Sequence, residues 1–485
     1  MQMQETGYGE ALTRLAAQDP ERVALYFDDE PRTIGALERR ANRLARTYQS
    51  LGVRHGRIVT IAIGNSFELL VAMFAAWKIG ALPNPVSPAM PREELAAFID
   101  CADSALIVGV PEGIVPGRRS IPLDYEPDPS LPDTPLPPLA EHSFERALGS
   151  GGSTGRPKVV IAQARAVFGA APNNELFKPD QAVLVPGPIY HAVPFSGAIQ
   201  GLMNGCTVIV MKRFDAEKCL ALIARHRIDR LWVVPTMLLR IWRLPEEVRG
   251  RYDVSCLKNL FSSSAPLPDW LFKCWIDWLG PEVVNNVYGP SERIGCTMIN
   301  GRDWLEHPGS VGKPLPFCRM RVLNEQGEDC APGQMGEIYF MPVAGVGSSY
   351  RYLGAESRRT ADGWESVGDM GYVDADGWLY LGDRRADMIL LGGRNIYPAE
   401  VEAAIEQHPA VRSCAVIGLP DEELGNRIHA IIDTAGAPLT AAEMADHLKP
   451  KLTYYKIPSS FEFVDISLRS DAGKLRRSAL RAARL

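Results

Sequence analysis

The residues from Ser150 to Lys158 read SGGSTGRPK and carry the strongest local signal in the chain. Small residues dominate this stretch, so its backbone N–H groups can face an anion without obstruction, and its hydroxyls and the Lys158 ammonium add further donors. It is not a Walker loop, because Gly-Lys-Ser/Thr is absent. A flexible Ser/Gly linker is the alternative. A linker does not need the ordered Thr-Gly-x-Pro-Lys ending, so the stretch predicts a phosphate-binding loop.

The segments around this loop alternate between helical and strand patterns. Residues 33–51 place their apolar side chains along one stripe of a helix, and residues 58–63 (IVTIAI) form a β-branched run. A helix at 66–79 follows, and the alternation returns between residues 206 and 235. Strands that alternate with helices favour parallel sheets covered by helices. Beyond about residue 305, short strands between turn signals predict a small antiparallel β-layer. The expected fold class is therefore α/β, with parallel or mixed sheets.

The chain has 485 residues, which is more than one hydrophobic core usually accommodates. The last hundred or so residues alternate helix and strand in the manner of a separate, small α+β unit. The polar run GDRRAD at 382–387 is the best candidate linker. We therefore expect an N-terminal domain over residues 1–382, a hinge at 383–387 and a mobile C-terminal domain over residues 388–485.

Composition argues against several classes of partner. The formal net charge is −6 and the sequence pI is about 5.9, so the chain has no basic excess that would favour nucleic acid or an anionic membrane. Nine cysteines, an odd number without a Cys-x-x-Cys pair, favour reduced thiols in the cytoplasm. The N-terminus lacks the pattern of a secretory signal, and the apolar run 69–82 is too short to span a bilayer. The sequence leaves the oligomeric state open, including a homodimer.

Six motifs in order resemble those of the adenylate-forming superfamily, which includes acyl-CoA synthetases, luciferases and peptide-synthetase adenylation domains. SGGSTGRPK is similar to its signature loop, and the resemblance covers residues from about 10 to about 480. The other matching segments are Tyr190-His191 with Pro194-Phe195, NVYGPSE at 286–292, Gly368-Asp369, the run from Asp383-Arg384-Arg385 through GGRNIYPAE at 392–400, and GKLRR at 473–477.

This resemblance implies a role for each matching residue. The implied catalytic residues are Lys474, His191 and Glu292, and Thr154 with Glu292 would hold Mg²⁺. Coenzyme A would pass Gly392, Gly393 and Arg394. The implied residues around ATP or AMP are Ser150, Gly151, Gly152, Ser153, Thr154, Gly155, Lys158, Ser264, Ala265, Pro266, Asn286, Tyr288, Gly289, Asp369 and Arg384.

The chemistry accounts for these residue types, although each has a plainer interpretation. Negative charge builds up on the α-phosphate when a carboxylate is adenylated, so a cation such as Lys474 contributes most there. The Asp369 carboxylate can accept hydrogen bonds from both hydroxyls of a ribose. Alone, Lys474 or Glu292 would be read as a solvated charge, Asp369 as a turn residue and His191 as a core histidine. The paired glycines at 392–393 also suit a hairpin.

The resemblance predicts an acyl-CoA ligase that adenylates a carboxylic acid and then transfers the acyl group to coenzyme A. A stand-alone enzyme that loads a carrier protein is the alternative, and an inert acyl-binding scaffold is disfavoured because the polar motif residues are present. The opening Asp-Arg-Arg of the hinge tilts the expectation toward bulky, ring-bearing acids. Two departures from the family pattern are Val159, where relatives have Gly, and Ala386 at the hinge.

One active site must serve both steps, so we expect Lys474 and Gly393 to exchange places by rotation of the C-terminal domain about 383–387. Arg293 directly follows Glu292, the last residue of the NVYGPSE motif, and is the hardest residue to explain. It either points away toward a surface acid, or it pairs with Glu292 or fills space near the phosphates. If it pairs with Glu292, it would compete with Mg²⁺ for the carboxylate and bias the enzyme toward thioester formation from a preformed acyl-adenylate.

Overall fold

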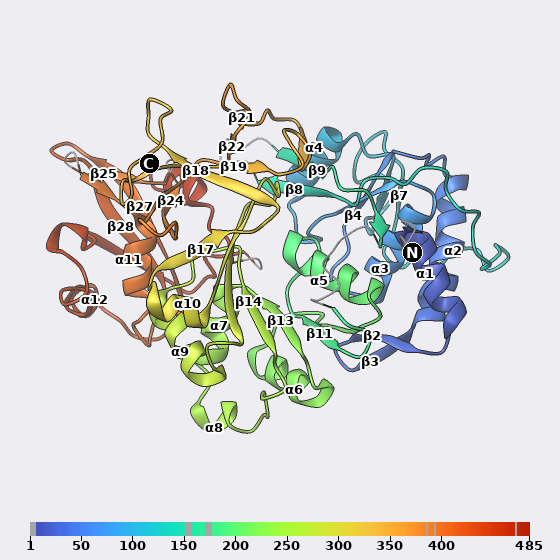
Figure 1. Ribbon diagram of the computed structural model, residues 1–485, viewed down its shortest axis with the longest axis horizontal. Helices are drawn as coiled ribbons and strands as arrows, with labels where there is room; N and C mark the ends of the chain where they lie inside the picture. The colour runs from blue at the N-terminus through green and yellow to red at the C-terminus, as the bar shows by residue number, and fades with distance from the viewer. Residues whose placement is uncertain (1–5, 152–156, 170–176, 385–386, 392–393, 471–472) are drawn as a thin grey trace.

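The computed structural model describes residues 6–151, 157–169, 177–384, 387–391, 394–470 and 473–485. For residues 150, 151, 157, 383, 384 and 395 it describes the backbone only. Figure 1 shows the N-terminal segments at one side of the molecule, the green and yellow middle segments below and between, and the C-terminal segments at the opposite side.

A fifteen-stranded mixed sheet forms the centre of the fold. Its first half is parallel, with neighbouring strands in the order β2 (Val23–Phe27), β12 (Thr207–Val210), β11 (Ala182–Val185), β13 (Arg230–Val233), β14 (Asn259–Ser262) and β15 (Val284–Tyr288). Crossover helices connect these strands, as the alternating pattern predicted. They are α5 (Ala192–Met203), α6 (Ala216–His226), α7 (Pro235–Trp242) and α9 (Asp269–Leu279).

The second half of this sheet is antiparallel and contains the short strands predicted beyond residue 305. It continues edge to edge from β15 through β16 (Thr297–Asn300), β17 (Ser310–Pro314), β24 (Leu379–Arg384), β23 (Asp369–Val373) and β19 (Gly336–Pro342), which also pairs with β18 (Cys318–Leu323). The short strands β22 (Glu365–Ser366) and β21 (Arg358–Arg359) follow β19, whereas β3 (Glu30–Thr33) closes the opposite edge. Two short helices, α8 (Glu246–Arg249) and α10 (Gly301–Glu306), lie in the connections.

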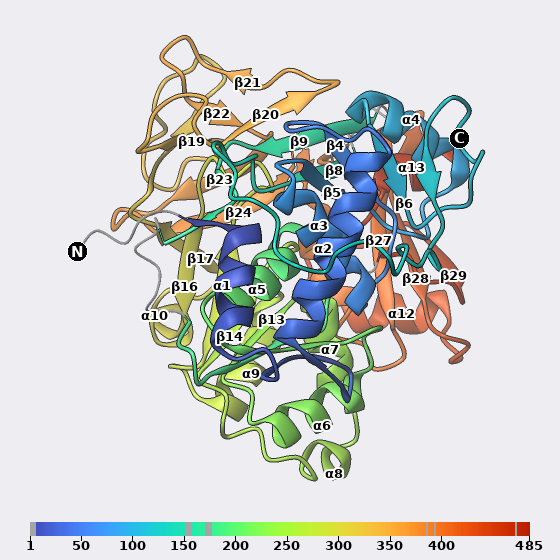
Figure 2. The same cartoon turned by 90° about the vertical axis from the view of Figure 1, so that its right-hand side faces the viewer.

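A second, parallel sheet lies in the N-terminal part, with the order β5 (Leu82–Pro85), β4 (Ile58–Ile61), β6 (Leu106–Val108) and β7 (Ser120–Ile121). The apolar run predicted as a buried helix is α3 (Phe67–Lys78), which begins where Ser66 Oγ accepts a hydrogen bond from the Leu69 N–H. Its single cation, Lys78, is buried and pairs with Glu38 at 2.7 Å. The helices α1 (Tyr8–Gln18) and α2 (Ile34–Ser50) run beside α3 on this side of the molecule (Figure 2), and α4 is Arg92–Ala102.

The predicted phosphate loop connects two strands of a three-stranded sheet. In this sheet β9 (Pro157–Ala162) pairs antiparallel with both β8 (Ala147–Gly151) and β20 (Tyr350–Leu353). Gly151 lies opposite Pro157, and residues 152–156 between them lie outside the described part of the chain. No helix follows the loop directly, in agreement with the absence of a Walker pattern. A two-stranded pair, β1 (Thr6–Gly7) with β10 (Val167–Phe168), joins the N-terminus to the segment after β9.

The C-terminal segment has its own core, as expected of an α+β unit. Strands β27 (Ser413–Asp421), β28 (Gly425–Asp433) and β29 (Ser460–Val464) form one sheet, and β25 (Ile389–Leu391) pairs with β26 (Arg394–Ile396). The helices are α11 (Pro398–Ile405), α12 (Ala441–Leu448) and α13 (Arg477–Ala482). Apolar side chains from both helices and strands are buried here, including Val401, Ile405, Val416, Ile432 and Leu448.

These observations confirm the expected fold class. All nine cysteines lie in the described residues, and none of them forms a disulfide bond there. Among the described residues, no helix has both the length and the apolar character needed to cross a bilayer.

Candidate active site

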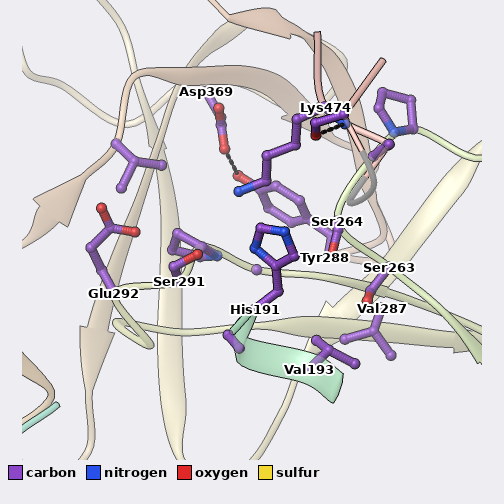
Figure 3. A pocket seen from close by; sticks show the side chains of 18 of the residues that line it. His191, Val193, Ser263, Ser264, Val287, Tyr288, Ser291, Glu292, Asp369 and Lys474 are labelled. Atoms are coloured by element: carbon purple, nitrogen blue, oxygen red, sulfur yellow. Dashed lines mark hydrogen bonds between the residues drawn. The ribbon is translucent and has the colours of Figure 1, made fainter. Parts of the chain in front are cut away.

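A cavity of about 2940 Å³ opens between the central sheet and the C-terminal segment. It collects predicted residues that are far apart in the sequence, because the carboxyl ends of the parallel strands and the turns after them face it. The predicted residues that line it are Lys158, His191, Ser264, Ala265, Pro266, Asn286, Tyr288, Gly289, Glu292, Asp369 and Lys474. Most of them surround one space in Figure 3.

Asp369 and Tyr288 mark one end of this cavity. Asp369 begins β23, directly after Gly368, whose φ of +85° lies in the left-handed region that glycine adopts without strain. The Tyr288 hydroxyl donates a hydrogen bond of 2.8 Å to Asp369 Oδ2 (Figure 3). The neighbouring Ser263 lines the cavity, and its buried hydroxyl has no partner among the described residues. A ligand with hydroxyl and amine groups would meet acceptors and donors here.

Glu292 has two neighbours that hold its carboxylate. The Tyr352 hydroxyl donates to Glu292 Oε1 at 2.5 Å, and the Lys158 ammonium lies 3.4 Å from the same oxygen. Lys158 also lies 4.4 Å from the centre of the Tyr352 ring. Burial and the adjacent Glu292 carboxylate raise the pKa of Tyr352, so its hydroxyl stays protonated and acts as the donor. The predicted phosphate-loop lysine and the predicted magnesium ligand are therefore neighbours.

His191 is neutral in this cavity. It precedes α5 as the N-cap residue, and its side chain points toward the side from which Lys474 enters (Figure 3). Burial, and then repulsion by the Lys474 ammonium, lowers the pKa of His191 to about 3. A neutral imidazole can accept or donate a hydrogen bond without adding a second positive charge beside Lys474.

This pKa shift predicts a pH dependence of stability. Since His191 binds a proton less readily in the folded than in the unfolded chain, its contribution to stability is present above about pH 6.5 and is lost as the pH falls toward 3. Between pH 7 and pH 5, His191→Gln should lose about 1–2 kcal/mol less unfolding free energy than the wild type. Denaturant titrations at both pH values measure this, with His55→Gln, an exposed histidine, as the control. Equal losses in the wild type and His191→Gln would contradict the buried neutral state.

Lys474 reaches the cavity because the turn that carries it is docked against the central sheet. Gly473 has a φ of +72°, and a β-carbon there would lie 3.2 Å from Thr236 Oγ1. Arg476, two residues after Lys474, forms an ion pair of 2.9 Å with Glu94 at the start of α4. The C-terminal segment therefore sits with Lys474 inward, the arrangement expected for the adenylation step.

The ion pair between Arg476 and Glu94 should favour this inward arrangement. Glu94→Gln removes one partner, and an exposed ion pair of this kind contributes at most about 1 kcal/mol. We expect acyl-adenylate formation to slow by about two- to fivefold, while thioester formation from a supplied adenylate is unchanged or faster. Glu93→Gln alters the adjacent exposed carboxylate and serves as the control. Equal effects of the two substitutions on pyrophosphate exchange would show that the ion pair has no such role.

Comparison with known proteins agrees with this geometry. The family described as AMP-binding enzyme matches residues 12–351, and the family described as AMP-binding enzyme C-terminal domain matches residues 400–474. The chain belongs to the AMP-binding enzyme family. A 2-succinylbenzoate–CoA ligase from Bacillus licheniformis is 30% identical over 97% of this chain and 98% of its own length. A feruloyl-CoA synthase from an Amycolatopsis species is 30% identical over 99% of each chain. The structure of o-succinylbenzoate CoA synthetase from Bacillus subtilis with its acyl-adenylate intermediate has a TM-score of 0.80 at 26% identity, over 99% of each chain.

In this AMP-binding enzyme, Arg293 pairs neither with a surface acid nor with Glu292. Its guanidinium forms an ion pair of 2.8 Å with Glu145, a buried carboxylate rather than a surface acid. The cation beside Glu292 is Lys158 instead. The predicted pairing of Arg293 with Glu292 is wrong, because Arg293 has a φ of 55° and its side chain leaves the chain toward Glu145. The competition with Mg²⁺ therefore has no structural basis, and neither has the predicted bias toward thioester formation.

Aromatic side chains form a flat wall of the same cavity. The Trp232 ring stacks on Phe177 with centroids 5.5 Å apart and on Phe261 with centroids 5.1 Å apart, and both interplanar angles are 17°. Phe177 and Trp232 line the cavity. Opposite Trp232, Gly197 of α5 has no side chain, and a β-carbon there would lie 3.4 Å from the Trp232 ring. A flat, apolar group fits beside such a wall.

Several predicted residues fall outside this description. Gly152, Ser153, Thr154, Gly155, Gly392 and Gly393 lie outside the described residues, and the side chains of Ser150 and Arg384 are not described. The backbone of Arg384 pairs with Asp369 across β23 and β24. Arg394 is exposed and its guanidinium lies 4.6 Å from the centre of the Tyr455 ring, away from the cavity-lining residues.

Three residues beside the motifs were not predicted from the sequence: Glu145, Arg146 and Tyr352. Glu145 and Arg146 directly precede β8, so their nearness to the phosphate loop was the available signal. Tyr352 lies opposite Val160 on β9, which places it diagonally beside Lys158. That pairing joins strands about 190 residues apart, and no local pattern indicates it.

Proposed function

We propose that this AMP-binding enzyme is an ATP-dependent acyl-CoA ligase that activates a ring-bearing carboxylic acid. One observation carries the proposal: Lys474 of the C-terminal segment, His191 directly before α5 and Asp369 of β23 face one cavity (Figure 3). Trp232 lines the same cavity. The residue expected to bind the nucleotide (Asp369), the cation expected to stabilise the phosphate charge (Lys474) and the aromatic side chain expected to contact the acyl group (Trp232) thus line one cavity.

In the first step, the carboxylate of the acid attacks the α-phosphorus of ATP, and pyrophosphate leaves. The Asp369 carboxylate accepts hydrogen bonds from the ribose hydroxyls, and the unpartnered Ser263 hydroxyl adds a further contact to the nucleotide. The Lys474 ammonium stabilises the negative charge that develops on the α-phosphate. The neutral His191 borders the carboxylate without adding charge.

Mg²⁺ fits the side chains present. In proteins this ion is usually held by one or two carboxylates together with substrate phosphates rather than by a complete protein cage. Glu292 supplies one carboxylate in the cavity, and the described residues contain no cluster of three or more metal-ligating side chains. When bound, the ion would neutralise charge on the leaving pyrophosphate. Tyr352 orients the Glu292 carboxylate through its hydrogen bond. Thr154, the second predicted ligand, lies outside the described residues.

In the second step, the thiol of coenzyme A attacks the acyl carbon and AMP leaves. Lys474 occupies the inward position, so we propose that the C-terminal domain rotates about the hinge at 383–387 before this step. We expect this rotation to bring the glycines at 392–393 to the cavity. These glycines lie between β25 and β26, which form an antiparallel pair. A disulfide that traps the inward arrangement should permit adenylation and block thioester formation.

We propose a ring-bearing acid because Phe177 and Trp232 line the cavity, with Phe261 stacked on Trp232. An aromatic ring packs against such side chains more favourably than a flexible chain, because aromatic pairs gain about 0.5–1.5 kcal/mol beyond area burial. A cytoplasmic location and the absence of nucleic-acid and membrane partners are further predictions that rest on the sequence alone, and the sequence leaves the oligomeric state open.

Purified protein, ATP, Mg²⁺ and a panel of aromatic acids test this proposal in three parallel reactions. The first follows pyrophosphate exchange, the second adds coenzyme A, and the third adds an acyl carrier protein instead. AMP and an acyl-CoA detected by mass spectrometry support the proposal. A thioester that forms only on the carrier protein would identify a carrier-loading enzyme. Failure of every acid to support exchange would overturn the proposed function.

A further inference from the structure

Two arginines share a single carboxylate at the acyl end of the cavity. Arg146 and Arg293, here called the arginine pair, both contact Glu145, at 3.3 and 2.8 Å respectively. The Ser196 hydroxyl of α5 accepts a hydrogen bond from each of them, at 3.3 and 2.9 Å. The Tyr8 hydroxyl donates to the other oxygen of Glu145 at 3.2 Å. None of these residues belongs to the motifs that implied the reaction.

This group carries a net charge of about +1 at neutral pH. Burial alone would raise the pKa of Glu145, but the neighbouring Arg293 and Arg146 guanidinium groups outweigh it and lower the pKa, so the carboxylate is ionised. Burial, together with the Arg293 guanidinium, lowers the pKa of Arg146 to about 10, which still leaves it protonated. Burial and the Glu145 carboxylate raise the pKa of Tyr8, so it is neutral. Two cations and one anion remain.

An uncompensated cation in a cavity wall is costly unless it meets an anion. Arg146 is fully buried against the Phe195 ring, whereas the Arg293 side chain is 39% exposed and lines the cavity. Arg293 uses two of the five N–H groups that a guanidinium has, toward Glu145 and Ser196, and the remaining donors have no partner among the described residues. Its φ of 55° also costs about 1 kcal/mol or more for a non-glycine residue. A packing role alone does not account for an arginine with unpaired N–H donors and an unfavourable backbone conformation at this position.

The position of the arginine pair relative to the reacting centre indicates which part of the bound acid would lie near Arg293. His191 and Ser196 are separated by five residues along α5, which corresponds to about 7 Å along the helix axis. The aromatic wall with Trp232 lines the same cavity. An acid whose reacting carboxylate lies near His191 and whose ring lies against Trp232 therefore extends its far end toward Arg293.

We propose that the acid activated by this enzyme carries a second carboxylate at its far end, and that Arg293 binds this group. The inference rests on the proposed function and deepens it. A carboxylate suits the site because a guanidinium offers parallel N–H donors that match two carboxylate oxygens. Bound there, it balances the excess charge of the arginine pair, with Glu145 holding the guanidinium in place from the opposite side.

Matched pairs of acids test this inference. The probes are benzene-1,4-disubstituted acids with zero to two methylenes before the reacting carboxylate, and each bears either a second carboxylate or an uncharged carboxamide on the ring. Wild-type protein should favour the diacid in kcat/KM by about 10- to 100-fold, the range expected for a hydrogen-bonded charge. In Arg293→Gln this ratio should fall to near one, and Arg293→Lys should keep part of it. Arg227→Gln removes a charge from the exposed surface and should leave the ratio unchanged.

The outcomes separate the inference from the proposed function. Turnover of the carboxamides and diacids at similar rates by the wild type would overturn the inference and leave the ligase function intact. If no probe supports turnover, the binding of a diacid in the absence of ATP still tests the inference. The diacid should raise the Tm of the wild type more than that of Arg293→Gln. Equal shifts in Tm for the two proteins, or none in either, would overturn the inference.

Discussion

Replacement of Lys474 by alanine is expected to lower the rate of acyl-adenylate formation by about 10²- to 10³-fold, the usual effect of removing one preorganised group that stabilises developing charge. Lys474 is placed to do this because Gly473 docks its turn beside Thr236 and Arg476 anchors the following residues on Glu94. The same substitution should leave thioester formation from a supplied acyl-adenylate nearly unchanged, since no phosphate charge develops in that step.

Pyrophosphate exchange measures the first step, and release of AMP from synthetic acyl-adenylate with coenzyme A measures the second. Lys449→Ala is the matched control, because Lys449 is an exposed lysine of the same domain that pairs with Asp446 on the surface. Equal losses in both steps would assign Lys474 a structural role. They would also remove the main support for rotation about the hinge.

Substitution of Glu145 by glutamine is expected to lower the free energy of unfolding by about 3 kcal/mol, because it leaves the buried Arg146 guanidinium and the partly exposed Arg293 guanidinium without a counter-charge. Among the described residues, Glu145 is the only carboxylate that forms an ion pair with Arg146 or Arg293. Its side chain is 4% exposed, so water compensates little for the loss.

Denaturant titrations measure this effect, and Glu141→Gln is the control. Glu141 lies four residues earlier and pairs with Arg165 on the exposed surface, where the loss of an ion pair should cost less than about 1 kcal/mol. The double variant Glu145→Gln/Arg293→Met should recover part of the stability, since only one buried cation remains. A loss below about 1 kcal/mol for Glu145→Gln would show that the guanidinium charges are solvated through the cavity.

Local signals determined much of the fold. The amphipathic segment at 441–448 is the helix α12, closed at its start by the capping box of Thr440 and Glu443. The apolar segment after Ser66 is the buried helix α3. These elements were predictable because periodicity and capping act between neighbours in the sequence. The antiparallel half of the central sheet was predicted as strands. Its edge-to-edge junction with the parallel half depends on the pairing of β15 with β16, which the sequence of neither strand indicates.

The sequence alone also contains the ordered motifs, and their resemblance to the adenylate-forming superfamily was enough to predict the chemistry. Only the tertiary structure decided which of the motif side chains meet. Tyr352 and Lys158 both contact Glu292, whereas Arg293, its neighbour in the chain, pairs with Glu145. The physical reason is that burial selects partners for charges across any sequence distance. A buried guanidinium must find a carboxylate wherever the fold brings one, and adjacency in the sequence does not indicate which one it will be.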